Sequence, residues 1–505
     1  MGIAVDARFR KMETLRNCIF LLGFVSYELL YEFEDFAEKV CLRFGCARGE
    51  GKCRRNGTTQ HRDFYKEGNF ADGLKSVGSG KAMTKYFLTK RFEEARRQLD
   101  FPIYPSKKLS RVEKKSPTIY FVTNSFPHTT SGYAVRTEKV AHALRQKGIP
   151  VRVCTRAGYP LVVGRWEATS LISQRRQGLV RLIPWTFSWN AWQRRRKAVK
   201  LLEEEARDFN AKLIITTTGF ENASIASEAA RNLNIPWVYE VRGEPESTWL
   251  AACPQKRDKT SEFYRRSRRK ENEAVTESGA QVFLSNVSKQ SFAERGLSLS
   301  RPVILPNSLD ESVLAANKAC TSNKVSGREE AGEIVVGSVS SLVGYEGFDT
   351  LIDALASTST RFRLLLVGGG KERNSLEQRA ARLGLQDRVS FVGPQPHAEI
   401  GEWYKKLDIF VLPRRDQSVT RMVTPIKHLE AMARGIPVIA SDLPALREAT
   451  GGLATYFPAG DASELSQCLE GVARGNHQAE QAYRWVSERT WSNLIEDLID
   501  ELWSE

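Results

Sequence analysis

Short apolar runs bounded by turn-forming residues recur along the chain from residue 118 onward. Residues 118–122 and 151–155 are two such runs, and both have the texture of parallel strands that are buried on both faces. Between them, apolar residues recur at helical spacing as far as Gly148, a typical helix stop. The buried face of this helix is expected to carry Tyr133, Val140, Ala141 and Leu144. The order strand, glycine-bearing turn, helix, strand predicts a βαβ unit.

The same alternation of strand and helix continues in two series. Further strands are predicted at residues 213–216, 237–241, 281–284 and 302–305 in the first series, and at 334–339, 363–367, 389–392, 409–412 and 437–440 in the second. Residues 311–332, between the series, have no apolar periodicity and are expected to form a linker. We therefore predict an α/β protein with two doubly wound, Rossmann-like domains that face each other across a cleft at the carboxyl ends of their strands.

The chain is also too long for one core, because its 505 residues exceed the ~250–300 residues at which a single core stops growing. The predicted parts are a helical, basic N-terminal extension at 1–112, Rossmann-like domains at 113–310 and 333–475, the linker at 311–332, and C-terminal helices at 476–505 that pack across the domains. Within the extension, helices are predicted at 16–43 and 82–98, and residues 48–80 are expected to form a polar loop.

Composition places the chain among soluble, folded enzymes and excludes disordered and fibrous classes, since 41% of its residues are hydrophobic and 27% are charged. The longest apolar run, 18–27, is too short to cross a bilayer, which needs ~20 residues. An acidic cluster follows this run, and no small-residue cleavage site precedes the cluster, so a signal peptide is not expected. We expect a cytoplasmic protein, located in the cytoplasm or at the cytoplasmic face of the membrane.

Charge suggests anionic partners, because 75 basic residues against 60 acidic ones give a formal net charge of +15. In the segment Trp185–Lys197, four aromatic residues run directly into four cationic ones. Tryptophan and arginine together favour the headgroup layer of a membrane, so this segment is a candidate for peripheral contact with anionic lipid. The alternative is a helix whose tryptophans pack inward. Nucleic-acid binding is not expected, because the basic residues are not interleaved with a base-stacking motif.

The eight cysteines are scattered and form no Cys-x-x-Cys pair, which excludes zinc ribbons and thioredoxin-like chemistry. Cys41, Cys46, Cys53 and His61 could supply four metal ligands, but their irregular spacing matches no zinc pattern. Reduced, structural thiols and no metal site are therefore expected.

Four passages of the sequence resemble one enzyme family. They are Phe126-Pro-His-Thr-Thr-Ser-Gly-Tyr133, Ile304-Leu-Pro-Asn-Ser-Leu-Asp310, Leu365-Leu-Val-Gly-Gly-Gly370 with residues 389–393, and Thr424-Pro-Ile-Lys-His-Leu-Glu-Ala-Met-Ala-Arg-Gly-Ile-Pro-Val-Ile-Ala-Ser441. Together they resemble the retaining nucleotide-sugar glycosyltransferases of the GT-B fold, family four, over residues 117–500. Residues 239–246 also look like members that build bacterial surface polysaccharides.

The resemblance implies transfer of a hexose-type sugar from a nucleotide-sugar donor to a lipid-linked or polysaccharide acceptor, in cell-surface polysaccharide biosynthesis. The first domain would bind the acceptor and the second the donor. Glu430 would hold the ribose hydroxyls. The segment Met422–Lys427, which includes Thr424, would open the helix that carries Glu430, with Pro425 in its first turn, and its free amides would cradle the diphosphate. Arg414 and Lys427 would act in catalysis as diphosphate cations, with Arg415 beside them. Gly132, Gly368, Gly369 and Gly393 would let the backbone approach the donor. No metal cofactor is implied.

The sequence departs from the family pattern at three positions. Met422 stands where a glutamate is common, and Ser340 and Glu346 stand where an arginine and a lysine are usual. We hypothesise that Arg414, Arg415 and Lys427 supply the missing charge. In the first domain no histidine matches the family's usual one. Arg242 and Glu244 are candidates for contacts with the acceptor or the donor sugar, with a structural ion pair as the alternative and His128 as another candidate.

Two other functions keep the same fold. One is a sugar-nucleotide epimerase or hydrolase that works without an acceptor. The other is a catalytically silent scaffold that binds sugar nucleotides, a reading suggested by the residues at 340, 346 and 422.

Overall fold

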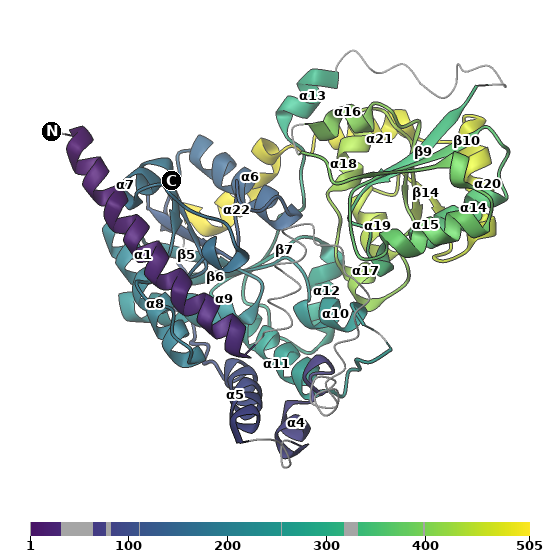
Figure 1. Cartoon of the computed structure of the whole chain (residues 1–505). Helices are drawn as coiled ribbons and strands as arrows, with labels where there is room; N and C mark the ends of the chain where they lie inside the picture. Colours follow the sequence, from purple (N-terminus) through teal and green to yellow (C-terminus); the bar gives the residue numbers. More distant parts are fainter. Residues whose placement is uncertain are drawn as a thin grey trace. The chain divides into compact units, whose positions relative to one another are not determined.

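The computed structural model describes residues 2–31, 64–76, 82–110, 112–253, 255–317, 332–396 and 399–504. The chain forms two compact units (Figure 1). Unit 1 comprises Met1–Val282, Leu297–Arg301 and Leu502–Glu505, and unit 2 comprises Phe283–Gly296 and Pro302–Glu501. The domain boundaries expected from the sequence, and the cleft between the domains, stay predictions.

The N-terminal sheet has seven strands in the order β4-β3-β2-β5-β6-β7-β8. The strands are β2 (Thr118–Val122), β3 (Val151–Thr155), β4 (Leu179–Arg181), β5 (Leu213–Thr217), β6 (Trp237–Val241), β7 (Gln281–Phe283) and β8 (Pro302–Ile304). The ladders of β2 with β3 and β5 are parallel, with Thr118 opposite Val151 and Leu213. Its helices are α6 (Gly132–Gln146), η2 (Leu161–Val163), α7 (Leu171–Gln177), α8 (Ala191–Asp208), α9 (Phe220–Leu233), α10 (Pro245–Ala251), α11 (Glu262–Glu277) and α12 (Asn286–Glu294).

The C-terminal sheet has six strands in the order β11-β10-β9-β12-β13-β14. They are β9 (Ile334–Val339), β10 (Phe362–Val367), β11 (Val389–Gly393), β12 (Ile409–Leu412), β13 (Val438–Ser441) and β14 (Thr455–Phe457), all in parallel ladders. The accompanying helices are η3 (Gly344–Glu346), α14 (Phe348–Ala356), α15 (Arg373–Arg382), η4 (Gln386–Arg388), α16 (Ile400–Tyr404), α17 (Ser418–Met422), α18 (Lys427–Met432), α19 (Pro444–Ala449), α20 (Ala462–Ala473), α21 (Ala479–Ser487) and α22 (Trp491–Leu502).

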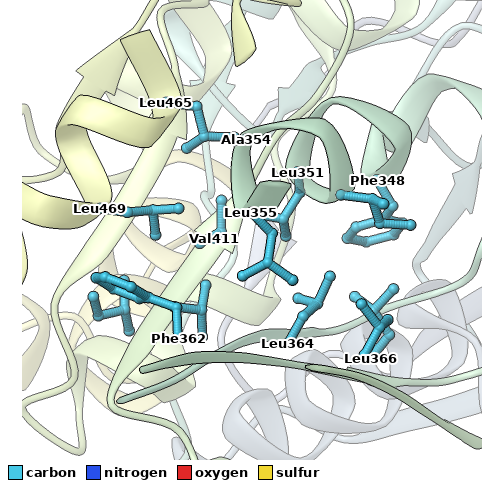
Figure 2. Packing of buried hydrophobic residues seen from close by; sticks show 14 of the residues in the cluster. Phe348, Leu351, Ala354, Leu355, Phe362, Leu364, Leu366, Val411, Leu465 and Leu469 are labelled. Carbon is cyan, nitrogen blue, oxygen red and sulfur yellow. The ribbon is translucent and has the colours of Figure 1, made fainter. Parts of the chain in front are cut away.

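A buried apolar cluster packs α14 and α20 against this sheet. Figure 2 shows the apolar side chains of α14 facing those of β10, with α20 closing one side of the cluster. Its members include Phe348, Leu351, Leu355, Phe362, Leu364, Leu366, Val411, Leu465 and Leu469, all buried. Burial of each such side chain contributes ~1.5–3 kcal/mol to the stability of the fold. This packing holds the sheet, and with it the turns at the ends of its strands, in place.

The predicted fold class is confirmed, with two doubly wound parallel sheets and a helical N-terminal region. The sequence missed β4 and β14. Tyr133 was wrongly placed in the core, because its side chain is 51% exposed, whereas the other three predicted core residues of α6 are buried. The prediction of a linker at 311–332 was also wrong in part, because its first residues form α13 (Glu311–Asn317). Residues 318–331 lie outside the described part.

The N-terminal region contains α1 (Gly2–Tyr31), α4 (Phe70–Ser76) and α5 (Ala82–Gln98), and the last matches its prediction. The helix expected at 16–43 begins much earlier, and its predicted end lies outside the described residues. The loop expected at 48–80 contains α4. A short ladder pairs β1 (Val112–Glu113) with β15 (Trp503–Ser504). No helix in the described ranges combines the length and the apolar character needed to cross a bilayer.

Candidate functional site

Turns at the carboxyl ends of β9, β10 and β11 lie side by side in unit 2. The Gly368 amide donates to the Gly393 carbonyl over 3.0 Å, and the Ser340 amide donates to the Val367 carbonyl over 2.8 Å. Gly368 has a φ of 139°, and a Cβ there would lie 1.9 Å from the Ser340 carbonyl oxygen. Only glycine permits this approach. The structure therefore brings Gly368, Gly369 and Gly393 together with Ser340 at one edge of the sheet, where ligands of doubly wound sheets bind.

A charged cluster occupies the ends of the neighbouring strands β9 and β12. Arg414 Nη2 donates to Glu346 Oε1 over 3.1 Å, and Arg414 Nη1 donates to the Val423 carbonyl over 2.9 Å. Lys427 Nζ lies 3.7 Å from the same carboxylate oxygen and donates to the Ser340 hydroxyl. Ser340 and Glu346, the positions where the resemblance predicts cations, are thus in contact with Lys427 and Arg414 respectively.

Neighbouring charges and burial shift the pKa values of Glu346 and Lys427 in this cluster. Burial raises the pKa of Glu346, but the charges of Arg414 and Lys427 outweigh it and hold the pKa below its usual value. Burial lowers the pKa of Lys427, and Arg414 adds to this while Glu346 opposes it. The Arg414 side chain is 7% exposed and the Lys427 side chain 29%. Lys427 is therefore the cation of this cluster that is open to a ligand, and Arg414 fixes the carboxylate that orients it.

Glu430 lies three residues after Lys427 on α18. Its Oε2 lies 3.2 Å from Arg434 Nη1, and 24% of its side chain is exposed. Arg415 lies outside the buried cluster, with 47% of its side chain exposed and an ion pair to Asp349.

The helix start predicted near Met422 was wrong. α17 ends at Met422, and α18 begins only at Lys427, so the buried residues Thr424 and Pro425 belong to the loop before the helix. α18 has six residues, and so short a helix carries little dipole. Side-chain charge and loop backbone, rather than a long helix, must supply any anion stabilisation here.

Arg242 in unit 1 belongs to a buried ion-pair network. It donates to Glu240 Oε2 over 2.9 Å, to Thr137 Oγ1 over 2.8 Å and to the Tyr133 carbonyl over 2.8 Å. Burial raises the pKa of Glu240, but Arg242 and Arg136 reverse the shift and lower the pKa to about 2. This geometry favours the structural alternative for Arg242. The network fixes the first turn of α6, which begins at Gly132.

The other candidates of unit 1 also have partners. Glu244 is buried and accepts a hydrogen bond from the Ser247 hydroxyl over 2.6 Å, at the start of α10. His128 Nε2 lies 3.2 Å from Glu167 Oε2, and its ring packs edge-on against Tyr159. The roles predicted for these residues stay predictions.

Metal ligands do not gather in the described ranges, where no three His, Cys, Asp or Glu side chains converge as a metal site would require. Cys41, Cys46, Cys53 and His61 lie outside those ranges.

Both sheets match known family models. The model described as "Glycosyl transferase 4-like domain" matches residues 131–308, and the model "Glycosyl transferases group 1" matches residues 333–474. The chain belongs to the GT4-type glycosyltransferases. The candidate site of this glycosyltransferase lies within the second match.

Curated relatives of the glycosyltransferase are similar over limited stretches. The lipopolysaccharide core biosynthesis mannosyltransferase LpsB of Rhizobium meliloti is 46% identical over 80 residues, 16% of this chain and 21% of LpsB. A D-inositol 3-phosphate glycosyltransferase of Corynebacterium urealyticum is 29% identical over 182 residues, 33% of this chain and 42% of that protein. The matched stretches thus span less than half of these relatives.

Solved structures support the GT-B fold across a much larger share of the chain. Sucrose-phosphate synthase from Thermosynechococcus elongatus superposes with a TM-score of 0.58 at 19% identity and covers 76% of this chain and 98% of that one. The Anabaena protein HepE, solved with UDP, gives a TM-score of 0.56 at 18% identity over the same shares. These likenesses show the fold.

Sequence reasoning missed Arg434, whose guanidinium holds Glu430 from one helical turn further on. The spacing of four residues between a carboxylate and an arginine was the available signal. It also missed that Glu346 pairs with Arg414, because these residues lie 68 positions apart.

Proposed function

We propose that this glycosyltransferase transfers a hexosyl group, with retention of configuration, from a nucleotide-diphosphate sugar to a lipid-linked or polysaccharide acceptor in the assembly of a cell-surface polysaccharide. The observation that carries the proposal is the cluster of Ser340, Glu346, Arg414 and Lys427 beside the glycine turn at Gly368. It combines a partly exposed cation, suited to a diphosphate, with a glycine turn that packs on the Ser340 carbonyl at the same edge of the sheet.

In the proposed mechanism the diphosphate lies against Lys427 and the Gly368–Gly369 backbone. The Glu346 carboxylate holds the ammonium group in place, and Arg414 fixes that carboxylate, because the two residues are buried and paired with each other. Glu430, clamped by Arg434 and partly exposed, accepts hydrogen bonds from the ribose hydroxyls. As the bond between sugar and phosphate breaks, negative charge grows on the leaving diphosphate, and Lys427 stabilises it without a metal ion. The acceptor hydroxyl bonds to the anomeric carbon on the same face, and its proton passes to the departing phosphate oxygen.

The names of relatives support the acceptor class. LpsB and LpsE of Rhizobium meliloti are both named as enzymes of lipopolysaccharide core biosynthesis. A Mycobacterium tuberculosis relative, 36% identical over 109 residues, is named a GDP-mannose-dependent mannosyltransferase, whereas HepE was solved with UDP. Both nucleotides are therefore tested as donors. We place the reaction in the cytoplasm, because Cys18, Cys154, Cys253 and Cys468, the free cysteines of the described ranges, suit a reducing compartment.

The test begins with donor binding by the purified full chain. UDP-, GDP- and ADP-hexoses are compared by thermal shift, since a bound donor stabilises the fold by mass action. We expect one nucleotide series to raise the melting temperature, and Lys427→Met to abolish that rise. Lys405→Met is the matched control, because Lys405 also lies in unit 2, with its side chain 57% exposed and in an ion pair with Glu402. An equal shift in all three proteins would contradict the assigned phosphate site.

Turnover then separates the three functions. Acceptor-dependent nucleotide release that persists in a chelator, with the anomeric configuration retained by proton NMR, supports the proposed transfer. Acceptor-independent conversion of the donor would instead identify an epimerase or hydrolase. Donor binding without turnover on lipid-linked saccharides and polysaccharides would identify a silent scaffold.

A further inference from the structure

From Met12 to Tyr27, where its side chains are described, the outward face of α1 is apolar and carries no charged residue. Between Met12 and Tyr27 the exposed residues are Met12, Thr14, Leu15, Cys18, Ile19, Leu22 and Ser26. The four large ones are 38–71% exposed, with Leu22 at 71%, and they recur every three or four residues along one stripe. The two charged side chains of this stretch, Glu13 and Arg16, pair with each other and are nearly buried. This part of the helix therefore exposes to solvent an apolar face without the charged side chains that are usual on a soluble protein.

The opposite face of α1 fastens the helix to unit 1. Phe20, Phe24 and Tyr27 pack on Phe187 with ring centroids 5.3–5.6 Å apart, and Phe20 also joins a buried cluster with Leu161 and Ile183. The Asn17 amide donates to the Glu167 carbonyl over 2.6 Å. Rotating the helix to hide its outer stripe would expose these aromatic rings, so the stripe is a fixed feature of the surface. Figure 1 shows α1 as one long helix along the outside of this unit.

Exposed tryptophans lie next to this anchoring point. Trp185 and Trp189, two residues to either side of Phe187, are 51% and 41% exposed. Trp185 and Arg16 of α1 line the same cavity of about 440 Å³. Elsewhere in the segment Trp185–Lys197, which the sequence predicts as a membrane contact, Trp192 packs on Phe101, and Arg195 is buried against Glu228. Only part of that segment is therefore exposed to solvent.

Charge around this cavity is positive. Five cations, Arg16, Arg175, Arg181, Lys197 and Lys200, line it with two carboxylates, Glu204 and Glu205. Arg16, Arg175 and Arg181 are paired with Glu13, Glu205 and Glu167 respectively, so the positive surplus at this cavity comes from Lys197 and Lys200. Lys200 is exposed, as is Arg196 nearby in α8. The surplus suits anionic headgroups, and it opposes a symmetric pairing of two copies through this face, because such pairing sets like charges against each other.

We propose that unit 1 docks on an anionic lipid surface through α1, which lies in the plane of the interface. The stripe Met12, Leu15, Ile19 and Leu22 enters the boundary between headgroups and acyl chains. Trp185 and Trp189 sit at headgroup level, and Lys197 and Lys200 contact lipid phosphates. α1 lies outside both family-model matches, and this docking does not depend on the proposed sugar transfer.

Flotation of the purified full chain with vesicles tests the docking. One vesicle contains phosphatidylcholine and phosphatidylglycerol in equal parts, and the other contains phosphatidylcholine alone. We expect binding to the anionic vesicle, weaker binding at raised salt, and a loss of roughly tenfold in affinity for Leu22→Glu. The matched control is Leu383→Glu, which makes the same change at an exposed leucine of unit 2 and should bind as the unaltered chain does. Circular dichroism verifies the fold of both variants.

Three results would overturn the proposal. They are absence of flotation, equal flotation of the Leu22→Glu variant, and a stable dimer by light scattering that Leu22→Glu dissociates, which would assign the stripe to a second copy. Quenching of tryptophan fluorescence by brominated lipid, reduced in Trp185→Phe, would support the assigned depth. Donor thermal shifts do not involve vesicles, so failure of docking and failure of the transferase assignment remain distinguishable.

Discussion

Glu346 is the carboxylate on which the two cations of the C-terminal cluster converge. Its side chain is 4% exposed, and that of its nearest charged partner, Arg414, is 7% exposed. A buried pair of this kind adds little net stability, but removal of one partner leaves an uncompensated charge in the interior. The residues that shape the candidate site are thus also structural, and single substitutions there affect folding and binding together.

Removing the Glu346 carboxylate should destabilise the chain. We expect Glu346→Ala to lower the free energy of unfolding by about 3–5 kcal/mol, because Arg414 stays buried without its partner. Asp442→Ala is the control, since it breaks a pair with Arg447 in which both side chains are about half exposed, and it should cost no more than ~1 kcal/mol. Urea unfolding measures both. Similar losses in the two variants would show that the cluster is not held by this pair.

Glu271 should make stability depend on pH. Burial, with the neighbouring charges of Glu246 and Glu221, raises the pKa of Glu271 well above its ordinary value, although its carboxylate accepts hydrogen bonds from Tyr239 and the Phe220 amide. The folded chain then keeps a proton that the unfolded chain releases above a pKa of 4.5. Stability therefore falls as pH rises from 4.5 toward the folded pKa.

Glu271→Gln tests this sign. The variant should lose stability less steeply than the unaltered chain between pH 5 and pH 8, as measured by urea unfolding at each pH, with values referred to about 4.5 for the unfolded carboxyl. Glu277→Gln, on the same helix α11, should keep the original slope. Parallel slopes for the two variants would refute the assignment to Glu271.

At the scale of elements, Gly347 joins the site turn to α14. Its φ is 73°, and a Cβ there would lie 1.9 Å from the Pro413 carbonyl oxygen, just before Arg414. Gly384, after α15, has a similar φ of 67° with nothing within 4 Å. The two glycines thus share a left-handed backbone, which strains any residue with a Cβ, and differ in crowding.

The comparison of Gly347→Ala with Gly384→Ala isolates that crowding. Both variants should lose about 1–2 kcal/mol from the left-handed backbone. Gly347→Ala should lose a further ~1–3 kcal/mol from overpacking and also weaken donor binding, because it displaces the chain that carries Arg414. Urea unfolding and donor thermal shift provide the two readouts. Equal losses in both variants would mean that the turn after β12 moves to accommodate the added methyl group without a loss of stability.

The elements predicted best from the sequence are the central strands, because a strand covered on both faces is a continuous apolar run. β4 and β14 were missed because each has only three residues at a sheet edge and makes no such run. The start of α18 was misplaced because Pro425 suits the first turn of a helix, whereas in the structure Pro425 lies in the loop before Lys427. The glycine turn was predictable from its motif. The pairing of Glu346 with Arg414 was not, because periodicity carries no information about contacts between distant residues.

At the scale of the whole molecule, the two proposed ligand surfaces belong to separate parts of the chain. The candidate donor site lies at residues 340–430 in unit 2, and the outer face of α1 lies in unit 1. One is polar and built on glycine turns and buried ion pairs, and the other is apolar and edged by cations. Each should respond to its own ligand, with the net charge of +15 favouring anionic partners at both.

Hydrogen exchange should resolve these surfaces as two separate footprints. A bound nucleotide diphosphate, UDP or GDP, should slow exchange in peptides covering 340–342, 368–370 and 427–430, because a ligand suppresses the local openings through which amides exchange. Vesicles of phosphatidylcholine and phosphatidylglycerol should instead slow exchange across residues 12–27 of α1. With the Lys427→Met variant only the nucleotide footprint should vanish, and with Leu22→Glu only the vesicle footprint. Protection of α1 by the nucleotide alone would place the nucleotide elsewhere on the chain and refute the assignment of Lys427 and Glu430.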